Sequence, residues 1–177
     1  MIGTRPLRLA LFVLSYLLLA GAFAFAENAW APLDFLLGTW SGKGSGKPGE
    51  AVSGATTFAF DLDQKVLVRR NRAEYAAKEG GKSVVHEDLM IVYPQEGEPG
   101  YRAIYFDNEG HVIRYKVTVP AGKSSAVFET DPAEKGPRFR LVHELRPGGE
   151  LGTEFFIAQP GGEFKSYVKG TVKKTGA

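Results

Sequence analysis

The sequence contains no cysteine. This absence excludes a disulfide framework and a cysteine-ligated metal site, so the stability of the folded chain must come from the burial of apolar side chains. The chain is long enough for this, because a domain of about 150 residues removes roughly 70% of its unfolded surface from water. We expect one domain with a substantial apolar core.

A large excess of charge of either sign is also missing. Lys and Arg number 22 and Asp and Glu number 20, which gives a formal net charge of +2. Arg5 and Arg8 account for this surplus, so residues 27–177 are formally neutral. A nucleic-acid-binding protein normally carries a basic excess that neutralises phosphates. We therefore expect no nucleic-acid partner.

Sequence motifs of familiar catalytic sites are absent. The sequence has no G-x-S-x-G elbow, no H-E-x-x-H motif and no phosphate-binding P-loop. The stretch Gly42-Lys43-Gly44-Ser45-Gly46 is rich in glycine, but no P-loop pattern or following helix accompanies it. Glycines inside a strand pattern more often mark a bend or bulge. The lack of these motifs favours a binding protein over an enzyme.

Residues 1–26 have the layout of a secretory signal peptide. Arg5 and Arg8 form a basic start, an apolar run follows from Leu9 to Leu19, and Ala24-Phe25-Ala26 is an A-x-A cleavage site. We expect an exported protein, periplasmic or extracellular, with no stable membrane insertion after cleavage. The alternative is an uncleaved anchor, because the uncharged run 9–26 approaches the ~20 residues of a membrane span.

Residues 27–177 form the predicted domain, and their pattern is all-β. Segments rich in Val, Ile, Tyr, Phe and Thr alternate with Gly, Pro, Asp and Asn, and no segment has a long helical period. Short connections favour antiparallel neighbours, and closure into an up-and-down barrel removes the exposed edges. The ten predicted strands are 37–45, 52–61, 65–76, 83–93, 101–107, 111–119, 124–130, 138–146, 151–158 and 163–174.

The stretch from Leu33 to Gly46, LDFLLGTWSGKGSG, begins the barrel. An apolar helical turn leads directly into Gly38-Thr39-Trp40, and a strand punctuated by glycine follows. We expect the turn to form a helical plug at one end of the barrel, with Trp40 on the first strand closing its floor.

The Gly38-Thr39-Trp40 step resembles the G-x-W signature of lipocalins. The run Leu36–Gly42 and the ten strands are more similar to nitrobindin-type and fatty-acid-binding-type members of the calycin superfamily. The resemblance implies a barrel that holds a small hydrophobic or amphipathic molecule in its interior. It also implies, for the nitrobindin type, a haem held by a histidine on the closing strands. No histidine follows His143, and Tyr167, the nearest candidate there, alternates with lysines, so we expect no haem or metal cofactor.

Alternation of side chains predicts which residues line the interior. We place Tyr93 opposite Tyr101 and Phe106 opposite His111, with Gly110 at a positive-φ position in the turn. The opposite set, which includes Tyr101 and Tyr105, then faces outward, and a slip of one residue reverses the assignment. The interior candidates for ligand binding on these three strands are His86, Asp88, Met90, Arg102, Phe106, His111 and Tyr115.

The strand 65–76 has two registers. In one register Arg72 lies opposite Asp88 inside the barrel, and Arg70 shares the face of Arg72. In the other register Arg69, Asn71 and Tyr75 face inward. An arginine reaches the interior in both cases, where it must pair with a carboxylate of the protein or with an anionic head group. The resemblance to fatty-acid-binding proteins, which use interior basic and tyrosine groups in this way, favours an acidic amphipathic ligand. We take Arg70 and Arg72 as the candidate ligand-binding arginines.

Two other functions remain open. His86, Asp88 and His111 are predicted near one end of the barrel, where two imidazoles and a carboxylate could act as acid–base groups or metal ligands. The alternative is a purely structural role, in which His86 hydrogen-bonds Asp88 and His111 lies at a solvated strand end. Alternatively, a filled barrel would act through its outer surface. We expect His143 to be a core or interfacial histidine with its hydrogen bonds satisfied, rather than a ligand.

Overall fold

The computed structural model describes residues 29–43, 51–76, 82–97, 100–122, 124–131 and 136–176. The predicted signal peptide, residues 1–26, lies outside these residues. The chain divides into two compact units, Met1–Pro32 and Leu33–Ala177. In the first unit only residues 29–32 are described, as a turn and the start of a 3-10 helix. Among the described residues, no helix has the length and hydropathy needed to cross a membrane.

The second unit is all-β, as predicted. Every predicted strand is present, and each end lies within two residues of its predicted position. The strands are β1 (Gly38–Lys43), β2 (Ser53–Asp61), β3 (Val66–Tyr75), β4 (Val84–Pro94), β5 (Tyr101–Asp107), β6 (Val112–Thr118), β7 (Ser125–Glu129), β8 (Arg138–Arg146), β9 (Glu150–Ala158) and β10 (Lys165–Gly176).

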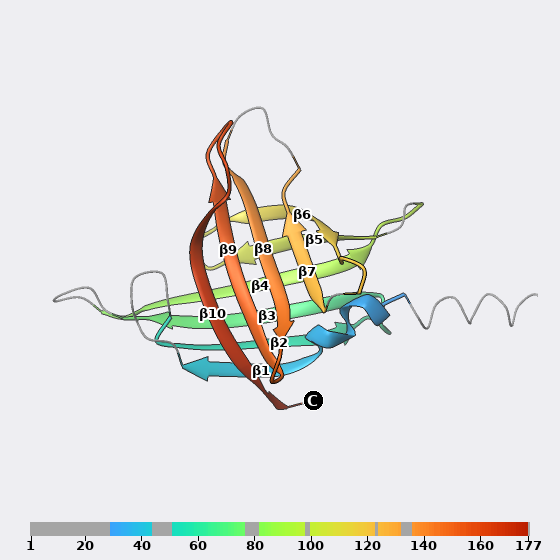
Figure 1. Ribbon diagram of the computed structural model, residues 1–177, viewed down its shortest axis with the longest axis horizontal. Coiled ribbons are helices and arrows are strands. Elements are labelled where there is room, and N and C mark those ends of the chain that lie inside the picture. The colour runs from blue at the N-terminus through green and yellow to red at the C-terminus, as the bar shows by residue number, and fades with distance from the viewer. Residues whose placement is uncertain are drawn as a thin grey trace, which may run out of the picture. The chain divides into compact units, whose positions relative to one another are not determined.

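The ten strands form a closed antiparallel barrel (Figure 1). Each strand pairs with the next strand along the chain, and β10 pairs with β1 to close the ring. In Figure 1, β1 to β4 run across the view, whereas β8 to β10 cross them steeply. Among the ten described strands, closure leaves no sheet edge unpaired, which removes the template for edge-to-edge association. The predicted up-and-down barrel is confirmed.

The 3-10 helix η1 (Ala31–Leu36) precedes β1. Its Leu33 and Leu36 side chains are fully buried, and Trp40 on β1 is only 2% exposed. The Trp40 indole Nε1 donates a hydrogen bond of 2.7 Å to the Leu36 carbonyl. Trp40 therefore joins the helical turn to the first strand.

The inward side chains divide the barrel into a packed part and a hollow part. On β4, Met90 and Val92 are fully buried, whereas His86 and Asp88 line a cavity. On β3, Leu67 is fully buried and the inward residues from Arg69 onward line the same cavity. Core and cavity thus lie one after the other along the same strands.

The seam between β1 and β10 requires a small residue at Gly42. A Cβ atom at Gly42 would lie 2.8 Å from the Thr171 carbonyl oxygen, a backbone atom that cannot turn aside. Gly54 lies opposite Gly42 on β2, and a Cβ atom there would meet nothing closer than 3.9 Å. Gly42 is the first glycine of the glycine-rich stretch 42–46, and it allows the close approach of two strands.

We expect Gly42→Ala to lower the free energy of unfolding by about 1–3 kcal/mol, because the seam must shift to accept the methyl group. Gly54→Ala is the matched control, and it should be close to neutral. Urea denaturation of both variants measures the difference. Equal effects of the two substitutions would contradict the close-approach explanation.

Candidate functional site

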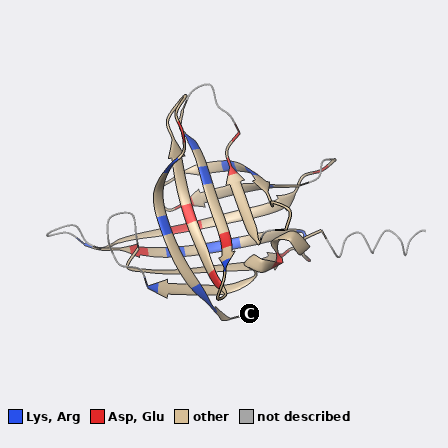
Figure 2. Cartoon of the chain, in the orientation of Figure 1, with Lys and Arg blue, Asp and Glu red and all other residues tan. Residues whose placement is uncertain are grey.

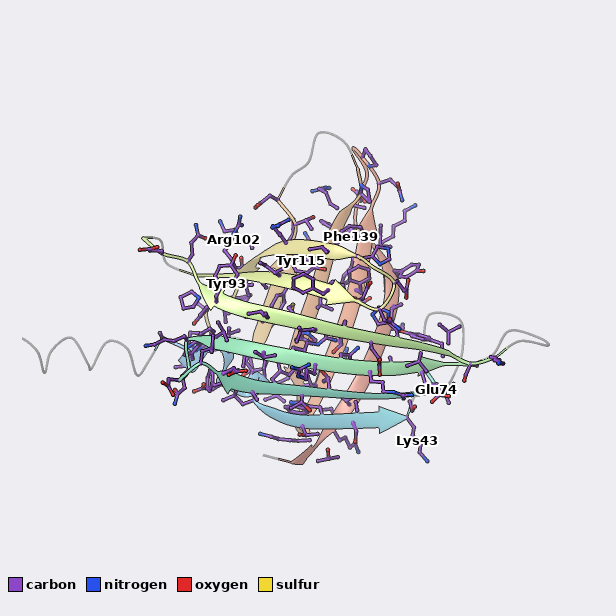
Figure 3. All side chains as sticks on the ribbon, turned by 180° about the vertical axis from the view of Figure 1, so that it is seen from behind. Lys43, Glu74, Tyr93, Arg102, Tyr115 and Phe139 are labelled. Carbon is purple, nitrogen blue, oxygen red and sulfur yellow. The ribbon has the colours of Figure 1, made fainter. Side chains whose placement is uncertain are left out.

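The cavity occupies about 1620 Å³ and opens at the end of the barrel away from Trp40. Figure 3 shows Lys43, Glu74 and Phe139 toward this end, and Tyr93 and Arg102 toward the other. Polar side chains from β3, β4 and β5 line one side of the cavity, and we call this side the polar wall. Its residues are Arg69, Asn71, His86, Asp88, Tyr105, Asp107 and, at the mouth, Glu109 and His111.

A buried ion pair forms the deepest part of the polar wall. The Arg69 guanidinium donates from Nη1 to Asp88 Oδ1 at 2.6 Å, and the two side chains are only 6% and 3% exposed. Asn71 Nδ2 donates to the other carboxylate oxygen of Asp88 at 2.8 Å. The Arg69 Nε atom is buried and has no hydrogen-bond partner. Removing two charges from water is costly, so the pair depends on this close geometry.

His86 links the ion pair to the cavity mouth. Its Nε2 lies 2.9 Å from the Tyr105 hydroxyl and 3.5 Å from Asp88 Oδ2, and its Nδ1 lies 3.0 Å from Glu109 Oε1. Hydrogen bonding to Asp88 raises the pKa of His86 to about 9; burial opposes this shift, and Glu109 adds to it. At neutral pH His86 is therefore an imidazolium whose two N–H groups both face acceptors.

The network continues through Tyr105 to the turn between β5 and β6. The Tyr105 hydroxyl donates to Asp107 Oδ2 at 3.2 Å, and His111 Nδ1 lies 2.9 Å from the same oxygen. Asp107 Oδ1 accepts from the backbone amides of Glu109 and His111. Burial raises the pKa of Asp107, but its hydrogen bonds to His111 and Glu109 lower it more, so its pKa lies below the ordinary value. The carboxylate thus holds the turn and orients Tyr105.

Aromatic and aliphatic side chains from β8, β9 and β10 also line the cavity. Phe139 and Phe155 stack with ring centroids 5.9 Å apart, and Tyr167 packs edge-on against Phe155 at 6.4 Å. Leu141 and Ile157 extend this apolar lining. The cavity therefore offers both charged groups and an apolar surface, which is the pattern of a site for an amphipathic molecule.

The structure selects the second of the two registers considered for β3. Asn71 lies opposite Asp88, and Arg69 opposite Met90. The choice of Arg70 and Arg72 as interior arginines is wrong, because alternation places both on the outer face. There Arg70 is exposed, and Arg72 Nε lies 3.4 Å from Glu87 Oε1.

The predicted facing of β5 is also wrong. Pro94, rather than Tyr93, lies opposite Tyr101, because the hairpin closes with the Gln95 amide donating to the Gly100 carbonyl. The one-residue slip turns Tyr101 and Tyr105 inward and moves two predicted interior residues to the outer surface. Arg102 pairs there with Asp131 at 2.9 Å, and Phe106 is 39% exposed.

The predicted facing of β6 is correct, because a second slip cancels the first. Phe106 lies opposite Val112, rather than His111, since Asp107 draws His111 into the turn. Gly110 has the predicted positive φ, 91°. Tyr115 faces inward and is 1% exposed, and His111 lies at the cavity mouth with 61% of its side chain exposed.

The remaining predicted residues divide between the cavity and the core. His86 and Asp88 lie in the polar wall and interact with each other, and their network reaches His111 through Tyr105 and Asp107. Met90 faces inward but lies in the packed core, outside the cavity lining. The sequence reasoning missed Tyr105 and Asp107. The sequence feature that could have found them is their spacing of two residues beside the β5–β6 turn, which places both polar side chains on the same face of β5.

His143 is a core residue, as expected, but its hydrogen bonds are not all satisfied. It is fully buried and makes T-shaped ring contacts with Phe58 and Phe128, and its Nδ1 lies 2.9 Å from Thr153 Oγ1. Its Nε2 is buried without a partner. Burial lowers the pKa of His143 well below the ordinary value, and the nearby Arg69 cation adds to this effect.

The positions of the described histidines and carboxylates bear on the metal and haem alternatives. Among them, no group of three or more His, Asp or Glu side chains is placed to hold a metal ion. Both ring nitrogens of His86 face hydrogen-bond partners, His143 lies outside the cavity lining, and His111 lies at the mouth with its Nδ1 bonded to Asp107. Tyr167 lies at the mouth and is 63% exposed.

Comparison with known proteins adds no family assignment. No family model matches the chain, and no curated protein matches it. The ten-stranded closed barrel is consistent with a calycin-like fold, and the functional argument must be made from the site itself.

We expect Arg69→Met to lower the free energy of unfolding by about 3–5 kcal/mol, because it leaves the Asp88 carboxylate buried without its cation. The control is Arg72→Met on the same strand, whose exposed pairs should contribute no more than about 1 kcal/mol. Urea denaturation measures both. A small effect of Arg69→Met would contradict the buried-pair description.

We expect the contribution of His86 to stability to fall as the pH rises. Its folded-state pKa of about 9 lies above the ordinary value of 6.5, so the contribution is complete below pH 6.5 and is lost as the pH rises through about 9. The difference in unfolding free energy between the wild type and His86→Gln should shrink over this interval. NMR titration should show the His86 ring titrating near pH 9, while His143 stays neutral. A His86 pKa near 6.5 would contradict the network.

Proposed function

We propose that this barrel binds a small hydrophobic or amphipathic molecule in its cavity, without a chemical reaction. The observation that carries the proposal is the cavity of about 1620 Å³, which exceeds the ~300–1,000 Å³ of typical small-molecule pockets. Protein interiors are normally close-packed, so a barrel with no ligand to hold would be expected to fill this volume with side chains.

The arrangement of the lining supports an amphipathic guest. The polar wall offers charged and hydroxyl groups, and the stacked Phe139 and Phe155 offer an apolar surface. An acid–base role for His86, Asp88 and His111 is less well supported, because each of these groups already has a partner within the polar wall.

Two further parts of the proposal depend on the sequence. We propose that the protein belongs to the lipocalin-like or nitrobindin-like calycins, on the resemblance around Gly38-Thr39-Trp40 and the closed barrel. We also propose that it acts outside the cytoplasm, in the periplasm or the extracellular space, on the signal-peptide pattern of residues 1–26. We propose no nucleic-acid partner, because Lys and Arg are mixed with Asp and Glu on the strands (Figure 2).

A substitution that fills the cavity should abolish binding of a neutral fluorescent probe, N-phenylnaphthylamine. Ala73 lines the cavity from β3, so Ala73→Trp introduces a large ring into it. Ala59 is exposed on β2, and Ala59→Trp is the matched control with the same added ring. Fluorescence titration should show binding to the wild type and Ala59→Trp, with a loss of at least about tenfold in affinity for Ala73→Trp, which corresponds to ~1.4 kcal/mol.

Circular dichroism and urea denaturation should show that both tryptophan variants remain folded. Binding that survives in folded Ala73→Trp, or no binding to the wild type, would contradict the proposed function. Native mass spectrometry of protein purified from its own host would then identify the guest that the cavity carries.

A further inference from the structure

The basic side chains of the polar wall are all engaged by carboxylates. Arg69 Nη1 lies 2.6 Å from Asp88, and His86 lies 3.5 Å from Asp88 and 3.0 Å from Glu109. His111 at the mouth lies 2.9 Å from Asp107. An acidic ligand would bind to the cations of this wall, but each of them already has a carboxylate partner from the protein.

The carboxylates would also oppose a second anion. Asp88 and Asp107 are buried, with side chains only 3% and 4% exposed, so water screens their charges weakly. A ligand carboxylate in contact with Arg69 would approach Asp88 as well, and it would lose its own hydration. The other basic residues that line the cavity, Lys43, Arg146 and Lys169, are exposed to solvent, where an ion pair contributes little.

Two phenol groups of the cavity remain available to a ligand. Tyr75 and Tyr115 line the cavity, and among the described residues their hydroxyls have no hydrogen-bond partner. Burial raises the pKa of Tyr75 and Tyr115, so both hydroxyls stay protonated and can donate. Tyr115 packs edge-on against Tyr105 and Phe128, which holds its ring in place. A fixed, neutral donor suits a neutral acceptor oxygen.

We propose that the cavity selects an uncharged molecule with an oxygen acceptor, such as an ester, amide or ketone, which the hydroxyls of Tyr75 and Tyr115 bind, and that the paired charges of the polar wall exclude a carboxylate. This inference rests on the proposed function and names the class of its ligand. The Arg69–Asp88 pair then determines specificity, because Asp88 pairs with the guanidinium that would otherwise bind the carboxylate of an acidic ligand.

The test compares methyl dodecanoate with dodecanoate, which share one chain and differ in charge. Each displaces N-phenylnaphthylamine from the full-length protein at pH 7. The wild type should bind the ester more tightly. Asp88→Asn removes the competing carboxylate and leaves Arg69 as a free cation. We expect it to raise the affinity for dodecanoate about tenfold, the effect of one charge-assisted hydrogen bond, and so to narrow the preference for the ester.

A second variant keeps the test independent of how well Asp88→Asn folds. Tyr115→Phe removes only the hydroxyl, and we expect it to weaken the ester about fivefold. Tyr93→Phe, at the far end of the barrel (Figure 3), is the matched control and should change nothing.

The outcomes separate this inference from the proposed function. Tighter binding of dodecanoate than of its ester by the wild type would overturn the inference, as would an unchanged preference in folded Asp88→Asn or unchanged ester affinity in Tyr115→Phe. In each of these cases the cavity would still bind a small molecule. Failure of the wild type to bind N-phenylnaphthylamine would instead contradict the proposed function.

Discussion

The arrangement of the cavity depends on the buried ion pair between Arg69 and Asp88. Because the side-chain period of a strand is two residues, only one register of β3 against β4 brings this guanidinium to this carboxylate. A slip of one residue would turn Arg70 and Arg72 inward and Arg69 and Leu67 outward. The pair therefore fixes the register of two long strands, and Asn71 and His86 take their positions from it.

The sequence predicts the strands far better than the facing of their side chains. Turn residues and β-rich segments recur regularly, so all ten strands and the barrel follow from pattern alone. The facing of β5 depends on whether Tyr93 or Pro94 ends its hairpin, and the register of β3 depends on a contact with Asp88 far along the chain. Neither the end of this hairpin nor the contact with Asp88 can be determined from the local sequence pattern. The correct facing of β6 was reached through two errors that cancelled.

Closure of the barrel explains why the cavity has two chemically different sides. The buried ion pair and its hydrogen-bond network come from β3 to β5, and the stacked Phe139 and Phe155 come from β8 and β9. These groups of strands are far apart in the sequence, and the seam between β1 and β10 brings both around one space. Gly42 permits that seam, because its backbone lies too close to Thr171 for a side chain. A packing requirement at one strand pair thus supports a binding site formed by others.

The polar wall contributes less to stability than an apolar wall of equal volume would, because buried ion pairs seldom outperform well-packed hydrophobic groups. Two buried atoms near it, Arg69 Nε and His143 Nε2, also lack hydrogen-bond partners. Unsatisfied groups of this kind are rare in native proteins and call for an explanation. The needs of folding do not explain them, because the same faces of β3 and β4 carry the apolar Leu67 and Met90, which shows that apolar side chains can occupy this interior. Residues that break the rules of good packing concentrate at functional sites. The place where this barrel departs from an apolar interior is therefore the place where we assign its specificity.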